Sequence, residues 1–248
     1  MDGGYLERVQ TGIKGLDSML FGGIPAGNQV LVVGGPGAGK TLLSFEFLYR
    51  NALQGSKGIF FALEEQKDRL IENVKEAFSD LGKSIDEMIS KGMLIIDGED
   101  IVSRLNEGVT QPTYEFGKVV SDIETMVTDV GAKFVVIDPI TSMSVILDDP
   151  KVYRRTLLAL VANLRRLGLT SLITMEAKTP ERKFARFAPE YYLFDGILSL
   201  YQLGEEEKRI LAMEIMKMRG TNHSFVTSPY EITSSGFRVI SAEDVALP

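Results

Sequence analysis

A glycine-rich segment at residues 34–41 constrains this chain more than any other part of its sequence. It reads Gly-Gly-Pro-Gly-Ala-Gly-Lys-Thr and fits the phosphate-binding pattern G-x-x-x-x-G-K-[ST]. Gly37 and Gly39 can adopt positive φ angles, so the chain can curl around an anion with successive backbone N–H groups turned inward. An apolar run at 29–33 precedes the segment and a helical pattern begins near Lys40, which places the loop between a buried strand and a helix.

The residues of this loop predict how a nucleotide would be held. The ammonium group of Lys40 can reach the β- and γ-phosphates, and the hydroxyl of Thr41 can bind Mg²⁺. The helix N-terminus adds a favourable dipole. We therefore expect ATP or ADP with Mg²⁺ as cofactors. The expected nucleotide-binding residues of the loop are Gly35, Pro36, Gly37, Ala38, Gly39, Lys40, Thr41 and Leu42.

Composition narrows the class of protein. The 248 residues are 44% hydrophobic, enough for a single large domain over residues 1–248. Cysteine is absent and histidine occurs once, which excludes disulfide bonds and argues against a structural zinc site. No apolar run reaches membrane-spanning length and the N-terminus lacks a signal-peptide pattern, so we expect a cytoplasmic protein without membrane contact. The net charge of −7 argues against nonspecific coating of nucleic acid.

Short apolar runs alternate with amphipathic stretches up to about residue 175, and short runs separated by turns follow residue 195. The first pattern predicts an α/β fold with a mainly parallel central sheet and helices on both faces. The second predicts antiparallel C-terminal strands along one edge. The expected strands are 29–33, 58–63, 93–96, 133–138, 170–175, 196–203, 208–217, 224–232 and 236–240. The expected helices are 40–54, 67–81, 84–90, 114–130 and 151–167, and 97–113 is expected to be a surface loop.

Acidic residues stand where two of the expected strands end. Asp138 closes an almost wholly apolar run and is placed to hold Mg²⁺ through water, as a carboxylate does there in P-loop ATPases. Glu64 and Glu65 follow the run at 58–63 and would face the ligand crevice. Either carboxylate could orient or deprotonate the water that attacks the γ-phosphate. The simpler alternative for this pair is a solvated acidic start to the next helix.

Two basic residues stand two apart in a later expected strand. Lys217 and Arg219 would therefore project from the same face. Paired cations suit the charge that develops on a γ-phosphate, and their distance along the chain from the loop makes a neighbouring subunit's site a candidate. Solvated charges on an edge strand are the alternative. His223 follows in a loop, where an ordinary surface position is the default for a lone histidine.

A second basic segment lies at residues 178–187. Cationic and aromatic residues are interleaved there: Lys178, Arg182, Lys183, Phe184, Arg186 and Phe187. This pattern suits single-stranded nucleic acid, through phosphate contacts and base stacking. A plain exposed loop or a subunit-contact loop is the alternative, and a single such loop on an acidic chain favours it.

Five motifs in this order resemble the KaiC-like branch of the RecA/RadA superfamily of P-loop ATPases. They are residues 11–27 ahead of the loop, the loop itself, Leu63-Glu64-Glu65, Val135-Val-Ile-Asp138 and Lys217-Met-Arg-Gly-Thr-Asn-His223. The resemblance covers nearly the whole chain. It implies a RecA-like core in which the strand at 170–175 lies between the loop strand and the Asp138 strand.

The resemblance also implies an assembly. Family members usually form homo-oligomeric, hexameric rings with ATP at the subunit junctions. Lys217, Met218 and Arg219 would then contact the neighbour's nucleotide, and Thr221 and His223 would line it. The catalytic set implied is Lys40, Glu64, Glu65, Lys217 and Arg219, with Thr41 and Asp138 on the metal.

The chain also departs from well-known relatives. The clock protein KaiC has two such domains in tandem, whereas this chain has one, so the resemblance implies no clock role. The Ser-Thr phosphoacceptor pair of that protein corresponds to Tyr191-Tyr192 here. Recombinases place DNA-binding loops at the positions of 141–150 and 177–192, and the first has no basic residue here. A regulatory, oligomeric ATPase is therefore favoured, ahead of a DNA-binding recombination or repair accessory ATPase and of a small-molecule or protein kinase.

Overall fold

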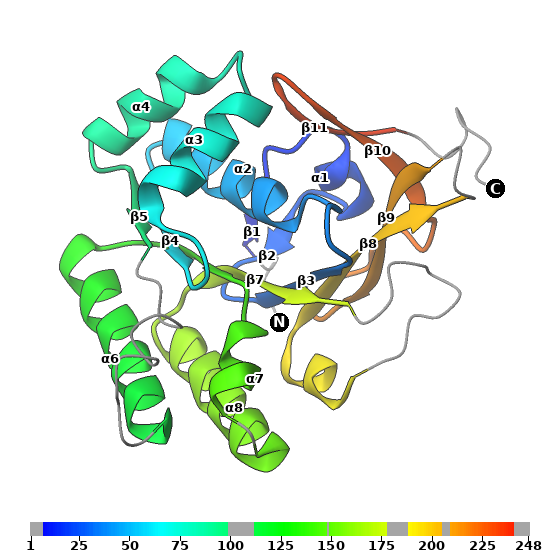
Figure 1. Ribbon diagram of the computed structural model, residues 1–248. Helices are drawn as coiled ribbons and strands as arrows, with labels where there is room; N and C mark the ends of the chain where they lie inside the picture. The colour runs from blue at the N-terminus through cyan, green and yellow to red at the C-terminus, as the bar shows by residue number, and fades with distance from the viewer. Residues whose placement is uncertain (1–6, 99–111, 148, 178–187, 205–208, 241–248) are drawn as a thin grey trace, which may run out of the picture.

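The described part of the chain is built on one large sheet. The computed structural model describes residues 7–98, 112–147, 149–177, 188–204 and 209–240. Within these residues nine strands lie in the order β11-β10-β9-β8-β3-β7-β6-β4-β5 (Figure 1). A separate two-stranded ribbon pairs β1 (Arg8–Val9) with β2 (Ile24–Pro25). The fold is a RecA-like α/β fold with a mainly parallel sheet, as the sequence predicted.

The sheet has a parallel part and an antiparallel part. The parallel strands are β3 (Gln29–Gly34), β4 (Gly58–Ala62), β5 (Leu94–Asp97), β6 (Phe134–Asp138), β7 (Thr170–Glu176) and β8 (Gly196–Leu203). The antiparallel strands are β9 (Ile210–Met218), β10 (Ser228–Thr233) and β11 (Gly236–Val239). Because β7 lies between β3 and β6, the extra strand implied by the resemblance is confirmed.

Helices cover both faces of the parallel strands (Figure 1). One face carries α2 (Lys40–Leu53), α3 (Lys67–Ala77) and α4 (Gly82–Ser90), and the other carries α6 (Pro112–Val130), α7 (Ser142–Ile146) and α8 (Pro150–Arg166). Side chains of β3 alternate between the two apolar clusters that result, with Val30 and Val32 in one and Leu31 and Val33 in the other. Every residue of β3 and β6 is buried, as double coverage requires.

Local sequence accounts for where two helices begin. Gly39 precedes α2 with φ of 82°, a left-handed conformation in which glycine is strongly favoured. Asp149 precedes α8, and its carboxylate accepts a hydrogen bond of 2.8 Å from the N–H of Lys151, with Pro150 in the first turn. Short elements also occur at α1 (Leu16–Met19) and at the 3₁₀ helix η2 (Pro189–Leu193).

The expected strands and helices are confirmed, with ends displaced by a few residues. The helix expected at 67–81 ends earlier, at Ala77, because the chain turns at Phe78. Segment 141–150, which corresponds to a DNA-binding loop of recombinases, contains α7 and the first residue of α8 instead. Most of the expected loop 97–113 and the whole basic segment 178–187 lie outside the described residues. No described helix is both long enough and apolar enough to cross a membrane.

Candidate active site

The glycine-rich loop connects β3 to α2 at the carboxyl edge of the sheet. Gly37 and Gly39 have φ angles of 73° and 82°, as their predicted role requires. A Cβ atom at Gly39 would lie 2.7 Å from Ile232 Cδ1, so packing as well as backbone conformation favours glycine there. Lys40 is buried, and its Nζ donates to the carbonyl of Gly35 at 3.1 Å. The loop therefore has the curled backbone and the buried cation of a phosphate cradle.

The two predicted metal residues lie in direct contact. Thr41 Oγ1 donates to Asp138 Oδ2 at 2.8 Å, and the Thr174 hydroxyl bonds to the other carboxylate oxygen. Burial raises the pKa of Asp138, while the two hydroxyl bonds and the charge of Lys40 oppose that rise. Among the described residues, no three acidic or histidine side chains form a metal cluster. A hydroxyl and a carboxylate suit Mg²⁺, which takes one or two protein ligands together with phosphate oxygens and water.

Three carboxylates surround Lys40. Burial lowers the pKa of Lys40, and the negative charges of Glu176, Asp138 and Glu64 oppose this effect. Glu176 was not predicted from the sequence. It ends β7 and pairs in register with Gly34, the first residue of the glycine-rich segment. An acidic residue that ends a strand next to the loop strand is the signal that could have found it, but only the strand order identifies that neighbour.

Glu64 and Glu65 point to different surroundings. Glu64 Oε1 accepts a hydrogen bond of 2.7 Å from Ser142 Oγ, just beyond the Asp138 strand. Glu65 Oε1 accepts a hydrogen bond of 2.5 Å from Asn73 and lies 3.7 Å from Arg69 Nε, both on α3. Glu64 therefore belongs with Lys40 and Asp138, whereas Glu65 interacts with the adjacent helix. Ser142 is a further residue that the sequence analysis missed.

Lys217 and Arg219 project toward one segment, as their spacing predicted. Lys217 lies in β9 and its Nζ donates to the carbonyl of Phe194 at 2.6 Å, while Arg219, one residue past the strand, lies 3.3 Å from Asp195 Oδ1. Burial lowers the pKa of Lys217, and the nearby Arg219 adds to this effect. Asp195 also forms an ion pair with Arg165. The Arg219 side chain is 54% exposed, which leaves it open to another molecule.

This basic pair lies at the opposite end of the sheet from the loop. Met218 pairs with Gly196, which pairs with Val30 near the start of β3. Gly35, which follows the last residue of β3, lies five positions after Val30. At the usual rise per strand residue, these two residues are about 16 Å apart. Within one chain, Lys217 and Arg219 are therefore too distant to touch a phosphate in the loop.

The other residues predicted to contact a neighbour's nucleotide interact here with residues of their own chain. Met218 is buried, and a Cβ at Gly196 would lie 2.6 Å from its methyl group. Thr221 Oγ1 accepts from Arg8 and bonds to the Asn222 carbonyl at 3.0 Å. His223 is 7% exposed, so it is not the surface residue that a lone loop histidine suggests, and its Nδ1 lies 2.9 Å from the carbonyl of Ser224. Nucleotide contacts by Met218, Thr221 and His223 remain predictions.

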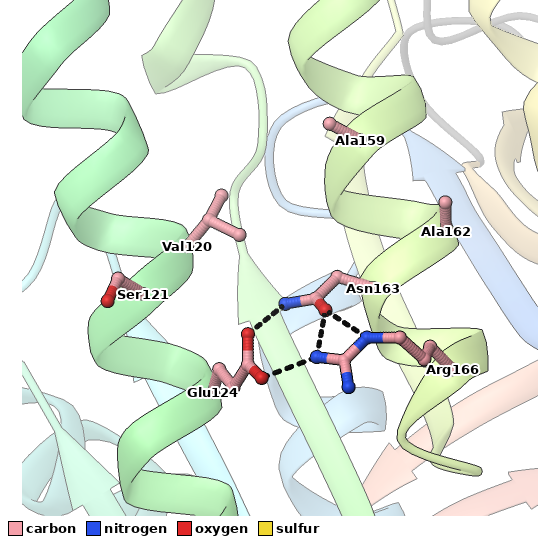
Figure 2. Close-up of a pocket in the computed structure, with 7 residues that line it drawn as sticks. All are labelled: Val120, Ser121, Glu124, Ala159, Ala162, Asn163 and Arg166. Carbon is pink, nitrogen blue, oxygen red and sulfur yellow. Dashed lines mark hydrogen bonds and ion pairs between the residues drawn. The ribbon is translucent and has the colours of Figure 1, made fainter.

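A groove between α6 and α8 is separate from these residues. It has a volume of about 510 Å³ and is lined by Val120, Ser121, Glu124, Ala159, Ala162, Asn163 and Arg166. Figure 2 shows that Glu124, Asn163 and Arg166 point toward one another across it. Asn163 Nδ2 donates to Glu124 at 3.1 Å, and Arg166 bonds to both residues. Because its charged groups already pair with each other, we assign it no role in the site.

Comparison with known proteins agrees with this geometry. The family described as "ATPase: KaiC" matches residues 9–244. A UPF0273 protein of Methanopyrus kandleri is 38% identical over 240 residues, which cover 94% of this chain and 92% of that protein. The circadian clock oscillator protein KaiC 1 of Synechocystis is 32% identical over 242 residues, which cover 94% of this chain and 44% of the clock protein.

A solved structure shows the same fold. The KaiC-like protein of the hyperthermophilic archaeon Pyrococcus horikoshii superposes with a TM-score of 0.79 at 29% identity, covering 95% of this chain and all of that chain. The resemblance inferred from the five motifs is thus confirmed at the level of the family. The phosphate-loop geometry, the nearly full-length family match and the shared fold together show that this chain belongs to the KaiC ATPase family.

Proposed function

We propose that this chain is a Mg²⁺-dependent ATPase of the RecA/KaiC type, whose active sites are completed between protomers of a hexameric ring. The single observation that carries this proposal is the placement of the two charged sets. The phosphate loop lies at one end of β3, and Lys217 and Arg219 lie beside the other end. One protomer can therefore hold a nucleotide but cannot bring these cations to its γ-phosphate.

Within one protomer, the loop N–H groups and Lys40 neutralise phosphate charge. Thr41 and Asp138 would hold a magnesium ion, which would stabilise the charge on the β- and γ-phosphate oxygens. We assign the water-activating role to Glu64. Its hydrogen bond from Ser142 and its interaction with Lys40 direct it toward the phosphates. Glu64 would orient the attacking water and accept its proton.

A second protomer would supply the stabilising cations. A contact between opposite surfaces of identical chains is heterologous, and such contacts form a ring when the rotation between successive subunits closes. Phe225 and Val226 follow the basic pair and are 76% and 53% exposed. Exposed apolar residues a few positions after the exposed Arg219 are consistent with a surface that another protomer covers.

We further propose a cytoplasmic, regulatory role in which nucleotide state alters the ring's affinity for a partner. The support for it is limited to kinship: KaiC 1 of Synechocystis, a relative, is described as a circadian clock oscillator protein. Nucleotide-dependent capture of partners would test this role. The ATPase proposal does not depend on it.

A subunit-mixing experiment tests the shared site. Lys40→Ala removes the loop cation, and Arg219→Ala removes the exposed guanidinium, so each variant alone should hydrolyse little ATP. Random 1:1 rings should regain about one quarter of wild-type turnover, because about one junction in four pairs an intact loop with an intact Arg219. Arg165→Ala is the matched control, since it also removes an arginine that pairs with Asp195 but leaves the more exposed Arg219 in place.

The ring composition must be checked at the same time. Native mass spectrometry should show mixed rings in the 1:1 sample. Mixed rings that remain as inactive as the parent variants would refute the assignment of Arg219 to the neighbour's site. A wild-type protein that stays monomeric in Mg²⁺ and ATP yet hydrolyses ATP at full rate would refute the ring.

A further inference from the structure

Two strands, β8 and β10, contact the phosphate loop through side-chain hydrogen bonds to its backbone carbonyls. Tyr230, in β10, donates a hydrogen bond of 2.5 Å from its hydroxyl to the carbonyl of Ala38. Gln202, in β8, donates a hydrogen bond of 3.0 Å to the carbonyl of Pro36. Both acceptors are loop carbonyls, and each directly precedes a glycine with positive φ.

Because the peptide bond is planar, these two carbonyl contacts also orient the N–H groups of the residues that follow. In a trans peptide the carbonyl of one residue and the N–H of the next point in opposite directions. When Tyr230 holds the Ala38 carbonyl outward, the N–H of Gly39 must turn inward. Gln202 has the same effect on the N–H of Gly37. These two amides lie in the nest that would receive the phosphates.

From this geometry we propose that Tyr230 and Gln202 are positioning residues, which hold the Gly39 and Gly37 amides toward the bound phosphates. The inference rests on the proposed function, because it concerns the same nucleotide site. Glycine is the residue type that most needs such restraint, since its backbone populates many conformations. A loop already restrained loses less conformational entropy when a nucleotide binds.

Tyr230 is itself held firmly. It is 3% exposed, and its ring stacks on Phe237 with centroids 5.4 Å apart. Burial raises the pKa of Tyr230, so the hydroxyl stays protonated and remains a donor at neutral pH. A Cβ at Gly39 would lie 2.9 Å from Phe237 Cζ, so the same aromatic pair packs directly on the loop.

The hairpin formed by β10 and β11 also contacts α2, the helix that follows the loop. The backbone N–H of Phe237 donates to Glu46 Oε2 at 2.6 Å, and Glu46 also accepts from Arg50 on the same helix. Glu46 is fully buried. The hairpin β10–β11 is thus attached to α2 at Glu46 and to the loop at Ala38. This double attachment fixes the distance between Tyr230 and the loop backbone.

The test compares nucleotide affinities of the purified full chain. Tyr230→Phe keeps the ring and removes the hydroxyl, and Gln202→Ala removes a partly exposed side chain together with its hydrogen bond to Pro36. Tyr230→Phe should raise the Kd for Mg²⁺-ADP about 3- to 10-fold, the range expected for one lost hydrogen bond. Gln202→Ala should raise it about 2- to 3-fold, because its bond is exposed to water. Affinity for adenosine, which has no phosphate, should not change.

Tyr201→Phe is the matched control. It removes a hydroxyl from the same sheet, at a largely buried tyrosine whose hydroxyl donates to Met216 Sδ at 3.8 Å. Thermal unfolding of the nucleotide-free variants separates positioning from plain stabilisation. If Tyr230→Phe lowers the melting temperature but leaves the ADP affinity at the wild-type value, the inference is overturned. Equal losses for ADP and adenosine would also overturn it.

The outcomes also separate this inference from the proposed function. Wild-type protein that binds neither ADP nor ATP would overturn both. Wild-type protein that binds ADP, together with a Tyr230→Phe variant that binds it equally well, would overturn only the positioning role. A selective loss of ADP affinity in both Tyr230→Phe and Gln202→Ala would support that role.

Discussion

Replacing each of the two adjacent glutamates by glutamine tests the assignment of the water-activating group. Glu64→Gln and Glu65→Gln are nearly isosteric and each removes one negative charge. The structure predicts unequal effects. Glu64 faces Ser142 and interacts with Lys40 and Asp138, whereas Glu65 is bound by Asn73 and Arg69 on α3.

The expected magnitudes follow from these surroundings. A positioned general base contributes about 10²- to 10⁴-fold to a rate, so Glu64→Gln should lower kcat by that range. Glu65→Gln loses an ion pair with the exposed Arg69, worth about 0.2–1 kcal/mol. Even if that whole energy were added to the barrier, kcat would change by about 5-fold at most. Neither variant should weaken ADP binding. Glu64→Gln removes a negative charge near the proposed phosphate site, and this removal would favour binding of the anionic ADP.

Single-turnover phosphate release at saturating Mg²⁺-ATP is the appropriate assay, because it reports the chemical step. Ring assembly and ADP affinity should be measured on the same samples, so that a slow rate is not mistaken for a loss of binding. If phosphate release is slowed as much in Glu65→Gln as in Glu64→Gln, the assignment of water activation to Glu64 is refuted. A wild-type rate of phosphate release in Glu64→Gln would refute it as well.

Two further substitutions probe the loop and the metal pair. Burial raises the pKa of Asp138, so the folded protein holds its proton at pH values where the unfolded chain has released it, and this contribution to stability falls as pH rises above the ordinary value of 3.8. Asp138→Asn should therefore stabilise the nucleotide-free protein more at pH 8 than near pH 4 in urea unfolding, yet abolish Mg²⁺-dependent turnover. A gain in stability that is no larger at pH 8 than near pH 4 would contradict this direction. Gly39→Ala should weaken ADP binding at least 10-fold, because φ is 82° and the new Cβ would meet Ile232 at 2.7 Å. Gly55→Ala is the control for backbone strain alone, because Gly55 has φ of 84° and its new Cβ would have no atom within 4 Å. That strain should lower the stability by about 1 kcal/mol. Similar ADP affinities for the two variants would contradict the packing argument.

Features that depend on residues close in sequence could be predicted well. The phosphate loop was predicted because its pattern lies within eight consecutive residues, 34–41. The buried strands were predicted because an apolar run such as the one ending at Asp138 is typical of a strand covered on both faces. The paired projection of Lys217 and Arg219 followed from the two-residue period of a strand.

Features that depend on strand order could not be predicted in this way. Tyr230 lies 192 residues from Ala38, and Ser142 lies 78 residues from Glu64, so no local pattern reports either hydrogen bond. Glu176 acquires its position beside the loop only because β7 pairs with β3. The choice between Glu64 and Glu65 likewise depends on which neighbouring elements each side chain meets.

The chain by itself determined the chemistry available, because the residue types that bind phosphate and Mg²⁺ are recognisable from short motifs. The tertiary structure alone decided which of these residues lie together and which lie at opposite ends of the sheet. Pairing of β9 with β8, and of β8 with β3, puts Arg219 at the end of the sheet opposite the loop. Sheet order is set by long-range packing that no single segment encodes, and it is this order that makes a second protomer necessary to the proposed site.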